Sequence, residues 1–237
     1  MRSLPMPRIY MNNNTAILIF ANSAEFEAIQ KPFKSSEVLF DALNSHTLNI
    51  VKKTGLSYFL SSEKNQTGDS FGERFTNAIQ SVYNKGFETV ITIGNDTPQL
   101  KTNHILRAVH YLQQNDIVLG PSKDGGFYLM GLKQSYFNSE TFLKLPWQTS
   151  KLRRSISRLV ISKHIKLSYL EILSDIDTIR DTETIIDSFS RIPRHIKQLL
   201  LAYISVEKKI TNSRFSSIET SIQALLFNKG SPALLHL

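Results

Sequence analysis

Short apolar runs alternate with helical patterns along most of the chain. The runs predict strands at 15–21, 56–60, 89–93, 116–119, 125–132 and 165–170. Between them, apolar residues recur every three or four positions and predict helices at 36–53, 71–85, 103–114, 150–163 and 182–189. Such alternation predicts an α/β fold, in which right-handed crossovers build a mainly parallel sheet with helices on both faces. Sheets of this kind bind ligands beyond the carboxyl ends of their strands.

The pattern divides the chain into three parts. We expect a flexible N-terminus over 1–14, a main domain over 15–190 and a helical extension over 191–237. The extension has an apolar segment at 197–204. We expect this segment to pack on the main domain, and a homodimer contact or a helix on a membrane surface are the alternatives.

Composition narrows the class of protein. The chain has 237 residues and no cysteine, which excludes a disulfide framework and a thiolate nucleophile. No stretch of the sequence reaches the roughly 18 apolar residues of a transmembrane helix. The N-terminus also lacks the apolar core of a signal peptide. These features predict a soluble, cytoplasmic protein.

The net charge of +8 suits an anionic partner. The excess of Lys and Arg lies in the C-terminal half, with one cluster at 151–158 and a second beyond residue 191. Nucleic acid, a membrane surface and small phosphorylated substrates would each match it. Because no nucleic-acid-binding motif is present, we favour a solvated basic surface and expect no nucleic-acid partner.

Asp96 is the first candidate for chemistry. The β-branched run Thr89–Ile93 continues into Gly94, Asn95 and Asp96, and Pro98 follows. The glycine lets the chain turn and the proline blocks continuation of the strand, so Asp96 is left at the strand tip. A carboxylate there can hold Mg²⁺ or Mn²⁺ against phosphate oxygens. An Asx turn or a cap of the next helix is the alternative.

Two further acidic loops follow predicted strands. Asp124 precedes Gly125 and Gly126, which would let the backbone approach a ligand closely, although an ordinary Asp-Gly turn has the same sequence. Asp175 and Asp177 stand before a helix, where they could supply a second metal ligand or an N-cap. The occurrence of three such loops favours one shared site over three separate turns.

Five motifs follow one another along the chain: GDSFGERF (68–75), IGNDTPQL (93–100), LGPSKDGGFYLMGL (119–132), PWQT (146–149) and DIDT (175–178). In their order and spacing they resemble a bacterial family of glycosyltransferase-like proteins. That family has the GT-A fold of nucleotide-diphospho-sugar transferases and is related to the guanylyltransferases for phospholactate and molybdenum cofactor. The resemblance covers roughly 15–190 and implies a Rossmann-like three-layer αβα sandwich that binds a nucleoside di- or triphosphate.

The resemblance also implies roles for the matching residues. Asp96 and Asp177 would hold the divalent cation, Mg²⁺ or Mn²⁺. Asp124 would be catalytic, by orienting or deprotonating an acceptor hydroxyl. The nucleotide would contact Ala21, Asn22, Gly72, Arg74, Asn95 and Asp96, and the substrate would contact Gly125, Gly126, Trp147 and Thr149.

The first loop departs from the pattern of that family. Its members carry a glycine and a basic run that hold the nucleotide phosphates. Here 22–34 has no glycine, carries Glu25 and Glu27, and offers only Lys31 and Lys34 as cations. A loop without glycine cannot easily wrap backbone N–H groups around phosphate. The change weakens nucleotidyl transfer most, because that reaction must stabilise a departing pyrophosphate.

Taken together, these features predict a glycosyltransferase that uses a nucleotide-diphosphate sugar, a divalent metal and a small acceptor. One alternative is a nucleotidyltransferase that joins a nucleoside triphosphate to a phosphorylated acceptor. The other is a family member without catalysis that acts as a binding or assembly module.

Overall fold

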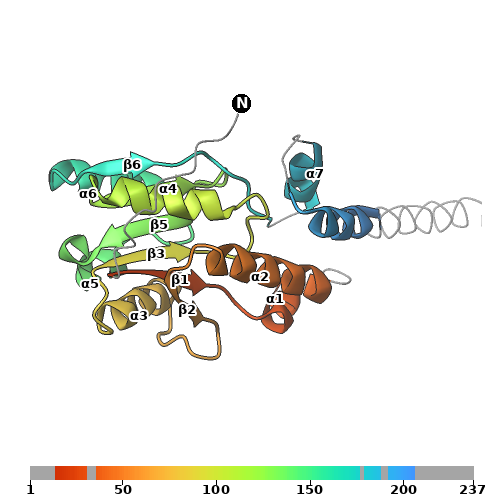
Figure 1. Cartoon of the computed structure of the whole chain (residues 1–237), viewed down its shortest axis with the longest axis horizontal. Coiled ribbons are helices and arrows are strands. Elements are labelled where there is room, and N and C mark those ends of the chain that lie inside the picture. Colours follow the sequence, from red (N-terminus) through yellow and green to blue (C-terminus); the bar gives the residue numbers. More distant parts are fainter. Residues whose placement is uncertain (1–13, 31–35, 177–178, 188–191, 206–237) are drawn as a thin grey trace, which may run out of the picture.

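A six-stranded sheet forms the centre of the fold (Figure 1). The computed structural model describes residues 14–30, 36–176, 179–187 and 192–205. The strand order is β2-β1-β3-β5-β4-β6. The α/β class and all six predicted strands are confirmed. Their bounds are β1 (Thr15–Phe20), β2 (Ser57–Ser61), β3 (Thr89–Ile93), β4 (Ile117–Pro121), β5 (Phe127–Lys133) and β6 (Leu167–Tyr169).

One strand departs from the parallel arrangement. β5 runs antiparallel to both β3 and β4, whereas the pairs β1–β2, β1–β3 and β4–β6 are parallel. Only residues 122–126 join β4 to β5, and so short a link cannot make the crossover that a parallel pair requires. As a result, β5 starts at the edge of the sheet where its two antiparallel neighbours, β3 and β4, end.

Helices follow most strands, as predicted. The loop after β1, for which the sequence predicted no helix, contains the short α1. The last predicted helix of the main domain begins three residues earlier than expected. The helices are α1 (Ala24–Gln30), α2 (Ser36–Lys52), α3 (Phe71–Tyr83), α4 (Thr102–Leu112), α5 (Ser139–Leu143), α6 (Leu152–Ser162), α7 (Ile179–Asp187), a 3₁₀ turn at Gln134–Tyr136 and a final helix at 194–205.

The core forms two layers because successive strand side chains point to opposite faces. Ala16 and Leu18 of β1 belong to a cluster with buried residues of α3, α5 and α6. Ile17 and Ile19 belong to a second cluster with α4 and the end of α2. The sheet is therefore covered on both sides, and its strand ends are left to bind a ligand.

A third apolar cluster joins α2 to the C-terminal part of the chain. Leu43 of α2 packs in this cluster with Ile185 of α7 and with Ile196 and Leu200 of the final helix. The rest of the predicted extension, 206–237, lies outside the described residues, and the dimer contact stays a prediction. None of the described helices is long and apolar enough to cross a membrane.

The buried position of β3 generates a stability prediction. Ile91 is fully buried at the centre of the sheet, whereas Ile161 on α6 is 75% exposed. Ile91→Ala should lower the free energy of unfolding by about 2–5 kcal/mol, through lost burial and the cavity left behind. Ile161→Ala should change it by less than about 0.5 kcal/mol. Urea denaturation followed by circular dichroism measures both, and equal losses would contradict the fold.

Candidate functional site

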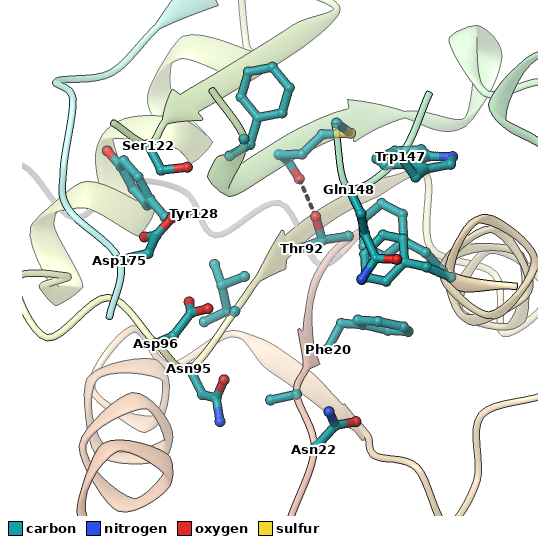
Figure 2. Close-up of a pocket in the computed structure, with 18 of the residues that line it drawn as sticks. Phe20, Asn22, Thr92, Asn95, Asp96, Ser122, Tyr128, Trp147, Gln148 and Asp175 are labelled. Carbon is teal, nitrogen blue, oxygen red and sulfur yellow. Dashed lines mark hydrogen bonds between the residues drawn. The ribbon is translucent and has the colours of Figure 1, made fainter. Parts of the chain in front are cut away.

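A cavity of about 740 Å³ opens at the carboxyl ends of the parallel strands. Residues that follow β1, β3 and β4 line it, together with the first turns of α3 and the segment 147–150 (Figure 2). Its volume lies within the range of small-molecule sites. The cavity is thus where the topology of the sheet predicts a ligand.

The structure brings most of the predicted site residues into this cavity. Their roles stay predictions, but residues up to 128 positions apart in the sequence share one space. Those that line it are Ala21, Asn22, Arg74, Asn95, Asp96, Asp124, Gly126, Trp147 and Thr149.

Three predicted residues stand apart from that set. Asp177 lies outside the described residues. Gly125 has a φ of +99° and forms the turn between β4 and β5. Gly72 lies under the Trp147 ring, and a Cβ there would be 2.7 Å from Trp147 Cδ1. Gly72 therefore makes room for a side chain of the cavity wall instead of lining the cavity itself.

Aromatic side chains form one end of the cavity. Phe20, Phe71 and Phe75 contact one another with ring centroids 5.1–5.7 Å apart. Trp147 joins them at 5.0 Å from Phe75, and its indole N–H donates to the carbonyl of Phe142 at 2.7 Å. The ring of Trp147 thus anchors its loop and also offers an apolar surface to a ligand.

Carboxylates form the other end. Asp96 and Asp175 both line the cavity, from the loops after β3 and β6 (Figure 2). The Thr97 hydroxyl donates to Asp175 Oδ1 at 2.5 Å, and the N–H of Ile176 donates to the Asp96 carbonyl at 3.0 Å. These bonds hold the two loops together. Both Asp175 and Asp177 of the DIDT string were candidate ligands in the sequence, and the resemblance assigned the metal to Asp177, whereas Asp175 is the one that the structure describes in the cavity wall.

Asp124 is held by its own loop. The buried Ser122 hydroxyl donates to Asp124 Oδ1 at 2.5 Å, and the N–H of Gly126 donates to the same oxygen at 2.9 Å. No described residue donates a hydrogen bond to Oδ2. One carboxylate oxygen is therefore fixed, and the other is available to a ligand.

The carboxylate of Glu63 accepts hydrogen bonds from Ser23 at the start of the first loop. The backbone N–H and the hydroxyl of Ser23 each donate to Glu63 at 2.7 Å. Burial opposes ionisation of Glu63, but the hydrogen bonds from Ser23, together with its own backbone N–H and the charge of Lys64, lower the pKa of this carboxyl. Glu27 lines the cavity and accepts from the Asn22 amide at 2.8 Å. The carboxylates of Glu27 and Glu63 thus accept the hydrogen bonds that Asn22 and Ser23 of the first loop donate.

An amide chain connects the two predicted nucleotide-binding loops. The Asn95 amide donates to Asn44 Oδ1 at 2.7 Å, and the Asn44 amide donates to the Asn22 carbonyl at 3.3 Å. Asn44 lies on α2, far from either loop in sequence. It sets the distance between the end of β1 and the end of β3.

The described lining of the cavity carries a net negative charge. Glu27, Asp96, Asp124 and Asp175 line it, whereas Arg74 is the only Lys or Arg among its described lining residues. Bare polyphosphate would be repelled, because like charges at short range are costly in a cleft of low dielectric. A cation, or an anion neutralised by a cation, suits this cavity better.

Gln148 is a cavity residue that sequence reasoning did not single out. Its side chain projects into the cavity beside Trp147 (Figure 2). Its φ is +56°, a backbone conformation that a side-chain-bearing residue adopts at a cost of about 1–3 kcal/mol and that recurs at functional sites. The sequence around it carries no signal for that conformation.

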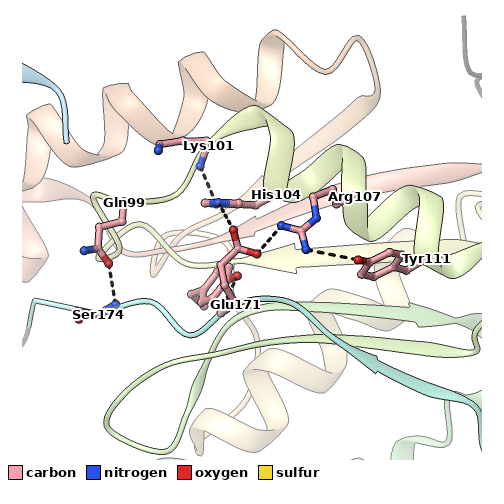
Figure 3. A network of polar contacts seen from close by, with 8 residues as sticks. Gln99, Lys101, His104, Arg107, Tyr111, Glu171 and Ser174 are labelled. Atoms are coloured by element: carbon pink, nitrogen blue, oxygen red, sulfur yellow. Dashed lines mark hydrogen bonds and ion pairs between the residues drawn. The ribbon is translucent and has the colours of Figure 1, made fainter. Parts of the chain in front are cut away.

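A polar network behind the cavity holds the segment that carries Asp175 (Figure 3). His104 Nε2 lies 3.0 Å from Glu171 Oε1, and Arg107 Nη1 lies 2.6 Å from Glu171 Oε2. The hydroxyl of Tyr128, a cavity residue, donates to the Glu171 carbonyl at 2.9 Å. Further along the segment, the Ser174 N–H donates to Gln99 at 3.0 Å.

Comparisons with known proteins agree with this fold. The model of a family described as "Uncharacterized protein conserved in bacteria (DUF2064)" matches residues 42–149. A "putative nucleotide-diphospho-sugar transferase" from Desulfovibrio desulfuricans G20 superposes with a TM-score of 0.70, at 20% identity over 83% of this chain and 97% of that one. The chain thus has the fold of nucleotide-diphospho-sugar transferases, and the fold that the resemblance implied is confirmed.

Two solved structures are more distant. The 4-diphosphocytidyl-2C-methyl-D-erythritol synthase from Anaerococcus prevotii DSM 20548 has a TM-score of 0.49, at 9% identity over 83% of this chain and 100% of that one. Rv0371C of Mycobacterium tuberculosis H37Rv, in complex with manganese, has a TM-score of 0.46, at 13% identity over 74% and 99%. Among curated proteins, none matches the sequence significantly.

The buried imidazole of His104 should make the stability of the protein depend on pH. Burial lowers the pKa of His104, and Glu171 only partly opposes this. His104 Nδ1 also accepts from the Lys101 N–H at 3.1 Å, a bond that protonation would break. Neutral His104 should contribute fully to the free energy of unfolding above the pKa of about 6.5 that histidine has in the unfolded chain. That contribution should be lost as the pH falls through the lower pKa of His104 in the folded protein.

The free energy of unfolding should therefore fall as the pH is lowered from about 7.5 through and below 6.5. His104→Gln should show a smaller fall over that range, measured by urea denaturation. The exposed His110→Gln is the control and should keep the wild-type slope. An unchanged slope in His104→Gln would refute a neutral, buried His104.

Proposed function

We propose that this protein is a GT-A-fold glycosyltransferase that binds a nucleotide-diphosphate sugar together with a divalent cation. The observation that carries the proposal is a single cavity with carboxylates at one end and aromatic rings at the other. The carboxylates suit a metal that neutralises the diphosphate. The rings of Phe20, Phe71 and Trp147 suit the flat face of a base or the apolar face of a sugar.

The residues present fit Mg²⁺ or Mn²⁺. The described residues contain no group of three or more His, Cys, Asp or Glu that could enclose an ion. Mg²⁺ does not need one, since proteins commonly hold it by one or two carboxylates while substrate phosphates and water complete the shell. Asp96 and Asp175 would be those carboxylates, with Asp177 still predicted from the sequence. When bound, the metal would offset negative charge on the leaving diphosphate.

The charge of the cavity favours a sugar nucleotide over a nucleoside triphosphate. A nucleotide-diphosphate sugar carries roughly half the charge of a triphosphate, so one divalent cation nearly neutralises it. A triphosphate complex would stay anionic near Glu27 and Asp124. Among the described lining residues, only Arg74 could offset that remaining charge. Both features count against the nucleotidyltransferase alternative.

Asp124 would act as the base toward the acceptor. The acceptor hydroxyl would attack the anomeric carbon, its proton would pass to Asp124 Oδ2, and the bond from that carbon to the diphosphate oxygen would break. Ser122 and Gly126 hold Oδ1, so the carboxylate is oriented before the substrate arrives. Such preorganisation lowers the cost of reaching the transition state.

Asp96→Asn tests the metal site. It should weaken binding of Mn²⁺ with a uridine or guanosine diphosphate sugar by about tenfold or more, because a charged ligand is lost. The fluorescence of Trp147, the one tryptophan of the chain, reports on the cavity directly, and isothermal titration measures the affinity. The exposed Asp41→Asn on α2 is the matched control.

If wild type binds no nucleotide sugar with either cation, the proposed function is wrong. If Asp96→Asn melts at a lower temperature but binds as wild type does, Asp96 is a structural cap.

Asp124→Asn tests the base. The amide keeps an oxygen for Ser122 and Gly126 but cannot accept the proton, so turnover should fall by about 10²–10⁴-fold while affinity holds. The readout is release of nucleoside diphosphate from each sugar nucleotide that binds, with water as acceptor. Glu140→Gln, an exposed acid on α5, is the control. Undiminished turnover in Asp124→Asn would assign the base elsewhere.

A further inference from the structure

The chain contains a long basic stretch without any acid. From 141 to 170 there is no Asp or Glu, although solvated surfaces normally mix both signs. This stretch includes α6 and β6, which lie together at one end of the sheet order. Its cations are Lys144, Lys151, Arg153, Arg154, Arg158, Lys163 and Lys166.

Helical geometry gathers three of these cations on one face. Leu152, Ile156 and Val160 are buried and define the inner side of α6. At about 100° per residue, Lys151, Arg154 and Arg158 fall on the opposite side. All three are exposed, and none makes an ion pair with a described residue. Within the described part of the protein, no carboxylate neutralises the charges of these three side chains.

Large apolar side chains stand beside these cations. Ile161 lies on the same outer side of α6 and is 75% exposed. Tyr169 of β6 is 46% exposed, and its hydroxyl lies 3.4 Å from the Ser157 hydroxyl on α6. Exposing an isoleucine costs free energy that burial in another phase would recover. We call Lys151, Arg154, Arg158, Ile161 and Tyr169 the α6 surface.

We propose that the α6 surface docks on a membrane that contains anionic lipids. The cations would meet lipid headgroups, each contributing about 1 kcal/mol near a charged surface. Ile161 and the ring of Tyr169 would enter the interface, where isoleucine is apolar enough to insert and tyrosine is amphipathic. A soluble polyanion would use the three cations but would leave Ile161 in water, so the combination of both kinds of side chain favours a membrane.

The α6 surface begins at the mouth of the cavity. Ser150 and Leu152 line the cavity, and Lys151 stands between them in sequence. Docking would therefore bring the cavity mouth close to the membrane. If the protein is the glycosyltransferase proposed above, its acceptor would be a hydroxyl-bearing molecule held at the membrane surface.

Vesicle sedimentation of the full chain tests the docking without reference to catalysis. Wild type should bind vesicles of phosphatidylcholine with about one third phosphatidylserine, and should not bind pure phosphatidylcholine. Binding should weaken with added salt. The triple variant Lys151→Gln, Arg154→Gln, Arg158→Gln should bind about a hundredfold more weakly, and Ile161→Ser several-fold more weakly.

The opposite layer supplies a matched control. Lys52 and Lys53 at the end of α2 lie near Lys101, because the Thr102 hydroxyl that begins α4 donates to the Ile50 carbonyl at 2.9 Å. The triple variant Lys52→Gln, Lys53→Gln, Lys101→Gln removes the same charge from the other face of the sheet, and it should sediment as wild type does.

Three outcomes would overturn the proposal. Equal weakening in both triple variants would show an effect of net charge alone. Unchanged binding by Ile161→Ser, together with heparin or nucleic acid binding as tight as that to vesicles, would show a soluble polyanion as the ligand. Absence of wild-type binding to anionic vesicles would refute docking outright. Nucleotide-sugar binding followed through Trp147 is independent of all three, so failure of the proposed function is seen separately.

Discussion

The parallel pairing of β1 with β3 is the constraint on which the site depends. It places Asn22 and Asp96 at the same edge of the sheet, and the amide of Asn44 then holds the two loops at a set spacing. The chain reverses direction in the five residues between β4 and β5, so Asp124 and Tyr128 lie at the same edge of the sheet. A slip of one residue would move every buried side chain of a strand to the other face, so the site and the core are specified together.

The charges of the molecule are segregated. Carboxylates collect inside the cavity, whereas the cations of α6 lie on the outer side of a helix that begins beside the cavity. An arrangement of this kind attracts anions to the outer surface and admits them to the cavity only with a cation.

Much of the fold could be predicted from the sequence, and the site only in part. The run Thr89–Ile93 is β-branched throughout, so its place as a central strand followed from composition and length. Helix α1 escaped prediction because seven residues carry too little periodicity to recognise. Asp175 could not be separated from Asp177 by sequence, since both stand in one short loop and only the hydrogen bond from Thr97 places Asp175 at the cavity.

By itself, the sequence determined the order of strands and helices, the acid-free stretch around α6 and the three acidic loops, because periodicity, charge and turn residues are local properties. Only the tertiary structure decided which carboxylates share a cavity, that Glu63 takes the Ser23 donor, and that Gln148 points inward at a positive φ. Those outcomes depend on contacts between residues about 40 or more positions apart, or on loop geometry that surrounding packing imposes.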